Sequence, residues 1–118
     1  MEGKYKLIKQ EEDVKALQDT IYVIGGKWKL PIVNSMCNGN KRFREIQRSI
    51  PKITTRMLSK ELKELEINGF ITRTVVDDTP VQVIYEFNEY AKTFAPVIKA
   101  MIKWGKEHSK KIRGLSND

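Results

Sequence analysis

The stretch from Lys41 to Arg73 reads KRFREIQRSIPKITTRMLSKELKELEINGFITR, and it contains two short helical patterns separated by a proline. In the first pattern, Phe43, Ile46 and Ile50 are spaced to lie on one side of a helix. Pro51 then ends this helix, because proline lacks a backbone N–H and its ring clashes with the preceding turn. The stretch therefore begins with a short amphipathic helix and a tight turn.

The second helical pattern starts after a pair of threonines and ends at a glycine. Thr54 or Thr55 is suited to cap its N-terminus, because a threonine oxygen accepts hydrogen bonds from the unpaired N–H groups of the first turn. Gly69 fits the position just beyond the C-terminus, where a left-handed backbone is common. Residues 41–69 are thus predicted to form a helix-turn-helix. The apolar stripe of its second helix consists of three leucines at i, i+4 and i+7, namely Leu58, Leu62 and Leu65.

The polar side of this second helix is basic. At about 100° per residue, Arg56, Lys60 and Lys63 fall opposite the leucines, with Ser59 beside them. Residues 41–63 hold eight Lys or Arg against two Glu, so +6 of the formal net charge of +7 lies in this segment. A basic helix face is often only a solvated surface. The concentration of charge favours instead a helix that enters the major groove of DNA.

A β-hairpin is predicted directly after the helix-turn-helix, in residues 70–88. Its strands are Phe70–Val76 and Val81–Asn88, joined by a turn with two aspartates. Val83, Tyr85 and Phe87 alternate and should face the core. In the first strand two faces are possible, formed by Ile71, Arg73 and Val75 or by Thr72, Thr74 and Val76. A hairpin in this position is typical of the wing of a winged helix. Because phosphates repel the acidic tip, we expect Arg73 and the threonines to make any contact between the wing and DNA.

Amphipathic helices are predicted near both ends of the chain. From Glu11 to Ile24 the apolar residues form a narrow stripe, which suits either the core or a seam with a partner helix, and we favour the seam. The last helix is predicted from Glu89 to Arg113, with Asn88 as its N-cap and a kink or distorted turn at Pro96. Its apolar arc spans roughly 180°, whereas a helix that faces one core needs about 100°. We therefore predict that residues 11–24 and 89–113 form a homodimer.

A further, largely buried helix is predicted within GGKWKLPIVNSMC, residues 25–37. Pro31 fits a helix only in its first turn, so the helix should start late or be distorted there. Cys37, near its end, is expected to be a small buried hydrophobe rather than a reactive thiol.

The composition is that of one globular domain spanning residues 1–118, with 40% hydrophobic and 31% charged residues. No apolar run is long enough for a signal peptide or a membrane span, and a single cysteine suits a reducing compartment, so we expect the protein in the cytoplasm. The pI near 9.5 favours a polyanionic partner, either nucleic acid or anionic lipid. Because phosphate-loop, metal-ligand and nucleophile motifs are absent from the sequence, no catalytic, cofactor or metal site is predicted, and an enzyme is not expected.

Several motifs in order resemble the HxlR-type winged helix-turn-helix regulators, which are relatives of the MarR proteins. The resemblance covers about residues 15–106 and implies a prokaryotic homodimeric transcription regulator. It further implies that the first and last helices form the dimer, that the helix from Thr54 enters the major groove, and that the hairpin is the wing. The motifs that carry it are Gly25-Gly26-Lys27-Trp28, Arg42-Phe43-x-Glu45-Ile46, Ile50-Pro51-x-Ile53-Thr54-x-Arg56-Met57-Leu58, Leu62-x-x-Leu65-Glu66-x-x-Gly69-Phe70-Ile71-x-Arg73, Tyr85 and Trp104-Gly105.

The chain departs from this pattern in places that do not bear on DNA contact. Many relatives carry a redox-sensing cysteine about ten residues before the double glycine, where this chain has Lys15. Pro31 replaces a usual aliphatic residue, and Asn88 and Ala91 stand where Thr and Gly are more common. Thiol sensing through the usual position is therefore not expected.

The sequence thus predicts an α+β, mostly α, winged helix-turn-helix with a two-stranded wing and terminal dimerisation helices. The function it predicts is a homodimeric, sequence-specific double-stranded DNA-binding regulator, a repressor, on an inverted-repeat operator. The alternative is a winged-helix module whose basic face binds an acidic protein. The sequence names no small-molecule effector. The predicted DNA contacts are Arg42, Thr54, Thr55, Arg56, Ser59, Lys60, Lys63 and Arg73.

Overall fold

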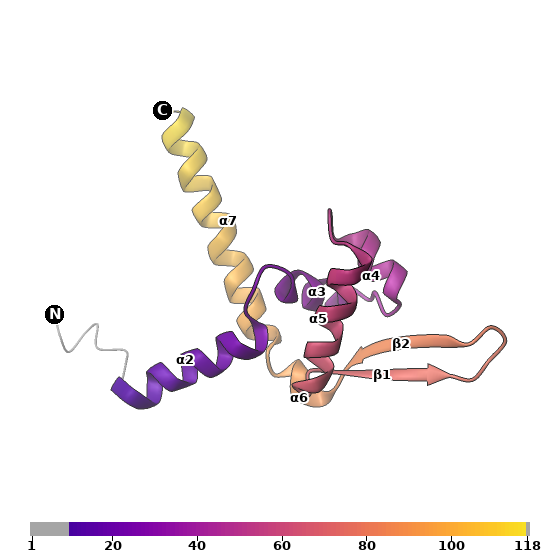
Figure 1. Ribbon diagram of the computed structural model, residues 1–118. Helices are drawn as coiled ribbons and strands as arrows, with labels where there is room; N and C mark the ends of the chain where they lie inside the picture. The colour runs from indigo at the N-terminus through magenta and orange to yellow at the C-terminus, as the bar shows by residue number, and fades with distance from the viewer. Residues whose placement is uncertain (1–9, 118) are drawn as a thin grey trace.

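The computed structural model describes residues 10–117 and is mostly helical with one two-stranded sheet, as predicted (Figure 1). In Figure 1 the hairpin extends from the central helices on one side, and the first and last helices extend on the other. The described elements, in chain order, are α2 (Gln10–Ile24), α3 (Lys29–Cys37), α4 (Phe43–Ser49), α5 (Thr55–Ile67), β1 (Ile71–Val76), β2 (Gln82–Phe87), α6 (Glu89–Lys92) and α7 (Ala95–Asn117).

The core lies between α3, α4, α5 and the base of the hairpin. The three leucines of α5 are buried, as their helical spacing predicted, and they meet Ile32 of α3 and Ile46 of α4. Full burial of one such aliphatic side chain contributes roughly 1.5–3 kcal/mol to folding. This core therefore fixes which side of α5 faces inward and which faces solvent.

The ends of α5 and the start of α6 are set by the predicted caps. Thr54 Oγ1 accepts a hydrogen bond from the Met57 N–H at 3.1 Å, and Gly69 follows α5 with a φ of +77°. Asn88 Oδ1 accepts from the Ala91 N–H at 2.8 Å, while its amide nitrogen donates to the carbonyl of Gly69. Asn88 thus caps α6 and also ties it to the end of α5.

The strand pairing decides which face of the hairpin turns inward. β1 and β2 are antiparallel, with Ile71 opposite Phe87, Arg73 opposite Tyr85, and Val75 opposite Val83. Residues directly opposite share a face, so the first of the two alternatives for β1 holds. Only the base of this face is covered, because Ile71 is buried whereas Val75 is exposed.

The prediction for the last helix needs correction. The helix predicted from Glu89 to Arg113, with a kink or distorted turn at Pro96, is instead two helices, because the chain breaks into α6 and α7 at Thr93 and Phe94, where Phe94 packs against the core. Pro96 is the second residue of α7, where its missing N–H removes no helical hydrogen bond. Pro31 likewise lies in the first turn of α3, as predicted.

The burial predicted for Cys37 is also wrong, since this residue is exposed at the end of α3. It lies on the flank of the apolar stripe, which is formed by Ile32, Val33 and Met36. Partial burial nevertheless raises the pKa of the thiol, while the charge of Lys99 acts in the opposite direction. The thiol is therefore mainly protonated at neutral pH.

The molecule is more extended than a compact domain of its size. Its radius of gyration is 17.7 Å, whereas about 13–14 Å is typical for this chain length. The excess comes from α2 and α7: residues 99–113 of α7 are exposed throughout. Among the described helices, none is both long and apolar enough to cross a bilayer.

Candidate nucleic-acid interface

The polar side of α5 faces solvent over its whole length. We define the basic face of α5 as Arg56, Ser59, Lys60 and Lys63, all of which are exposed. The leucines on the opposite side hold the helix against the core, so this face is presented on a rigid support. The basic face of α5 and the other four predicted contact residues are all exposed.

The two threonines at the start of α5, the N-cap Thr54 and the first helical residue Thr55, already have structural roles. Thr54 caps the helix, so its oxygen is engaged with the backbone. Thr55 Oγ1 accepts a hydrogen bond from Gln47 Nε2 of α4 at 3.1 Å, which links the two helices of the motif. A hydroxyl that accepts one hydrogen bond still has a proton to donate, so either side chain retains a donor for a phosphate oxygen.

Arg42 lies apart from α5 and is directed to the wing. Its Nη2 donates to Gln82 Oε1 on β2 at 2.7 Å. Glu45 Oε1 accepts from the backbone N–H groups of Lys41 and Arg42, and these bonds lower the pKa of its carboxyl. Tyr85 N–H donates to the Lys41 carbonyl at 2.8 Å. The start of α4 is therefore fastened to β2, and Arg42 is held at the wing side of the interface.

Arg73 and α5 meet at a hollow between the helix and the hairpin. This hollow is lined by Ser59 and Lys63 of α5 and by Arg73 and Tyr85 of the hairpin, and Glu66 also contributes to it. Arg73 is on the inner face of β1, beyond the buried base. The structure thus brings Arg73 together with two residues of the basic face of α5, although they are 10 and more positions apart in the sequence.

The tip of the wing differs from its base in charge. Asp77 and Asp78 are both exposed, and Asp78 Oδ1 accepts from the N–H of Thr79 at 2.8 Å. Val75 and Val81 near the tip are exposed as well. An acidic tip is unfavourable next to phosphates, and the predicted basic contacts lie instead on α5, at the start of α4 and at Arg73.

A partly buried ionic cluster, which was not predicted from the sequence, lies behind α5. Lys29 Nζ of α3 donates to Glu61 Oε1 at 2.5 Å and to Glu64 Oε2 at 2.7 Å. Burial of Lys29 acts to lower its pKa, but the hydrogen bonds and charges of the two glutamates outweigh this and raise it. The same contact lowers the pKa of Glu64. A signal was present, because Lys29 has helical spacing with Ile32 and Met36 on the buried stripe of α3.

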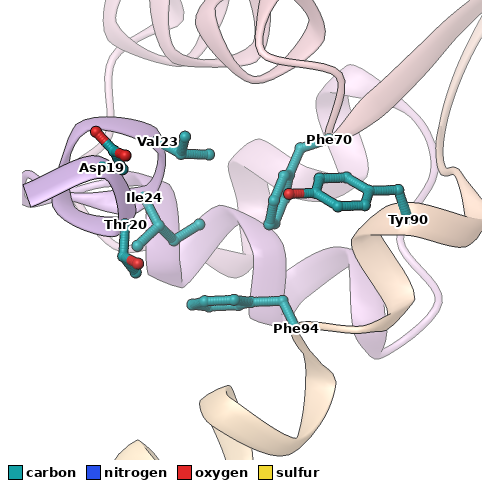
Figure 2. A pocket seen from close by; sticks show the side chains of 7 residues that line it. All are labelled: Asp19, Thr20, Val23, Ile24, Phe70, Tyr90 and Phe94. Carbon is teal, nitrogen blue, oxygen red and sulfur yellow. The ribbon is translucent and has the colours of Figure 1, made fainter. Parts of the chain in front are cut away.

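A cavity of about 180 Å³ lies on the other side of the core, between α2 and the segment that follows the wing (Figure 2). Phe70 contacts Tyr90 and Phe94 edge-on, with ring centroids 6.1 and 5.6 Å apart. Figure 2 shows these rings across the cavity from the end of α2, where Ile24 also contributes. The cavity thus lies where α2 joins the body of the domain, away from the basic face of α5.

Comparisons with known proteins identify the family of this chain. The model of the HxlR-like helix-turn-helix family matches residues 23–113. The chain belongs to the HxlR-like helix-turn-helix family. An uncharacterised HTH-type transcriptional regulator of Bacillus subtilis, YtcD, is 37% identical over 99 residues, which are 84% of this chain and 79% of that protein.

Solved structures of regulators share the fold. The crystal structure of ytcD superposes with a TM-score of 0.75 at 38% identity, covering 80% of this chain and 96% of that one. The redox regulator HypR in its reduced form gives a TM-score of 0.78 at 37% identity, covering 84% and 98%. This HxlR-like chain is therefore a winged helix-turn-helix of the kind found in transcriptional regulators. Within the described residues, no group of His, Cys, Asp and Glu is arranged to hold a metal ion.

Proposed function

We propose that this protein is a sequence-specific, double-stranded DNA-binding regulator that acts as a homodimer in the cytoplasm and represses transcription. The observation that carries the proposal is the basic face of α5, exposed on a helix whose opposite face is locked into the core. A helix supported in this way can enter the major groove without rearrangement of the domain.

The positions of the exposed side chains suggest different roles in this interface. Arg56 is in the first turn of α5, nearest to the base edges in this docking geometry, and its planar guanidinium matches the O6 and N7 acceptors of guanine. Lys63 is two turns further along and is suited to a phosphate. Arg73 and Arg42 flank α5 on the wing side, where the sugar-phosphate backbone would pass.

The dimer part of the proposal rests on apolar surface that the single chain leaves uncovered. On α7, Trp104 is 66% exposed, and on α2, Leu17 is 57% exposed. Exposed apolar surface of this extent marks an interface in soluble proteins. A second copy covers it most simply, because each chain then supplies both helices. The exposed apolar residues of the two helices are Val14, Leu17, Ile21, Tyr22, Val97, Met101, Ile102, Trp104 and Ile112.

Repression is the simplest outcome for such a dimer on a promoter. Two recognition helices related by a two-fold axis read an inverted repeat with half-sites about one helical turn apart, or a multiple of that. A protein bound across promoter DNA excludes polymerase from the same face. Repression of this kind requires no partner other than the DNA, which supports the proposed role.

The test is a gel-shift titration with DNA from the region upstream of the protein's own gene, run beside a random-sequence duplex and in the presence of heparin. A regulator retains a retarded complex on the upstream DNA when heparin has removed the complex on the random duplex. If heparin abolishes both complexes equally, sequence-specific DNA binding is contradicted, and the basic face is then free for an acidic protein partner.

A further inference from the structure

The charge of α5, taken alone, is unexpected for a helix that binds DNA. Its three basic residues are matched by three acidic ones, so its formal net charge is zero. The acidic residues are Glu61, Glu64 and Glu66, and the first two are engaged by Lys29 of α3. A carboxylate near phosphates opposes binding, so the position and pairing of these groups matter for the interface.

The two glutamates bound by Lys29 differ in their distance from the basic face of α5. Glu61 is turned to the protein side, and its side chain is 13% exposed. Glu64 borders the basic face and is 40% exposed, with its second oxygen 3.8 Å from Lys60 Nζ. It also lines a shallow depression together with Arg56 and Lys60. Without a partner on the protein side, the Glu64 carboxylate would be free to turn to the DNA and to pair more closely with Lys60, which it already approaches.

The position of Lys29 suits it to hold the two glutamates rather than to contact a ligand. Its side chain is 11% exposed, and its ammonium lies between two carboxylates that are three residues apart on α5. Because the spacing of three places both glutamates on neighbouring turns, one lysine from α3 reaches both. In this cluster the positive charge of Lys29 partly offsets the two negative charges of the glutamates. The ion pairs also hold α5 against α3.

We propose that Lys29 is a positioning residue for DNA binding. It holds Glu61 and Glu64 on the protein side of α5 and screens their negative charges from the phosphates. The basic face of α5 therefore presents a positive electrostatic potential to the DNA, although the formal net charge of the helix is zero. The inference rests on the proposed function, because it assigns a role within the same interface. Glu66 has no such lysine partner among the described contacts, and it is the natural comparison within the same helix.

The first experiment compares two matched substitutions with Lys29 intact, Glu64→Gln and Glu66→Gln, by fluorescence anisotropy with a labelled random-sequence duplex at low salt. One unit charge about 8 Å from a phosphate in water changes affinity roughly twofold to threefold. Glu66→Gln is expected to tighten binding by about that factor, whereas Glu64→Gln, which removes an already screened charge, changes it less. Equal effects of the two substitutions, whether a gain or no change, overturn the proposal.

The second experiment removes the lysine. Lys29→Met is expected to weaken binding to the same duplex by roughly fivefold, since two carboxylates lose their screen. Lys29→Arg is expected to keep the affinity, and the triple variant Lys29→Met, Glu61→Gln, Glu64→Gln to recover it. A folded triple variant that binds as weakly as Lys29→Met shows a purely structural role and contradicts the proposal.

The outcomes separate this inference from the proposed function. If Lys29→Met does not fold, the comparison of the two glutamine variants decides alone, because both keep the lysine. If the wild-type protein binds no duplex at all, the proposed function fails and the inference fails with it. Wild-type binding combined with equal effects of Glu64→Gln and Glu66→Gln overturns the inference only.

Discussion

The body of the domain, formed by α3, α4, α5 and the hairpin, buries its apolar residues, whereas the terminal helices α2 and α7 leave similar residues exposed. In the body, Leu62 of α5 is 2% exposed and packs within one chain. On α7, Trp104 is 66% exposed although it belongs to a helix with an equally clear apolar stripe. Since both regions are amphipathic, periodicity alone does not separate a core from an interface. What separates them is whether the chain itself supplies the opposing surface.

The largest effect is expected from a substitution in the body of the domain, and it is an effect on folding stability. Leu62→Ala should lower the free energy of unfolding by about 2–5 kcal/mol, because it leaves a cavity in a closely packed core. Ile67→Ala on the same helix is the matched control, since Ile67 is 72% exposed, and it should change stability by no more than about 0.5 kcal/mol. Urea denaturation followed by circular dichroism measures both. Similar losses in the two variants would show that α5 is not oriented as described.

A charge on the terminal helices should act on assembly instead. Met101→Asp places a carboxylate on the exposed apolar stripe of α7 and should weaken the dimer by about 100-fold or more, equivalent to roughly 2.7 kcal/mol. Lys103→Asp puts the same charge on the opposite, polar side of α7 and should leave the dimer intact. Light scattering at micromolar concentration measures the mass of each variant. A wild-type monomer under these conditions contradicts the proposed homodimer.

The body of the domain was largely predictable from the sequence because its signals are local. The leucines of α5, the cap at Thr54 and the cap at Asn88 each depend on residues within a few positions, and all three are confirmed. The Lys29 cluster was missed because its partners are 32 and 35 positions away. The break between α6 and α7 was misplaced for a similar reason, since Phe94 packs against Phe70 in tertiary structure.

The sequence predicted which residues of α5 lie on its exposed face. The role of each residue depends on which part of the DNA it contacts. Arg56→Ala should weaken binding to operator DNA by about 1–3 kcal/mol and relax the preference at one base pair per half-site. Lys63→Ala should weaken binding to all sequences alike and reduce the salt slope by about one per monomer. Salt titrations on operator and random DNA distinguish the two. An equal loss for Arg56→Ala on both DNAs would make Arg56 a phosphate contact and leave base reading to Thr55 and Ser59.

The smallest expected effect is that of oxidation on DNA binding. Its test involves one residue of a terminal helix, Lys15, and one of the body, Cys37. Lys15 of α2 occupies the place where many relatives carry a sensing cysteine, and its ammonium lies 3.2 Å from Asp19 Oδ2. Cys37, in the body, is exposed, but partial burial raises its pKa, so little of it is thiolate at neutral pH. Diamide should therefore leave DNA binding unchanged, and Cys37→Ser should behave like the wild type with and without the oxidant. A loss of DNA binding on oxidation that disappears in Cys37→Ser would contradict this prediction. It would show that the exposed thiol of Cys37, in the body of the domain, senses oxidants in place of a cysteine on the first helix.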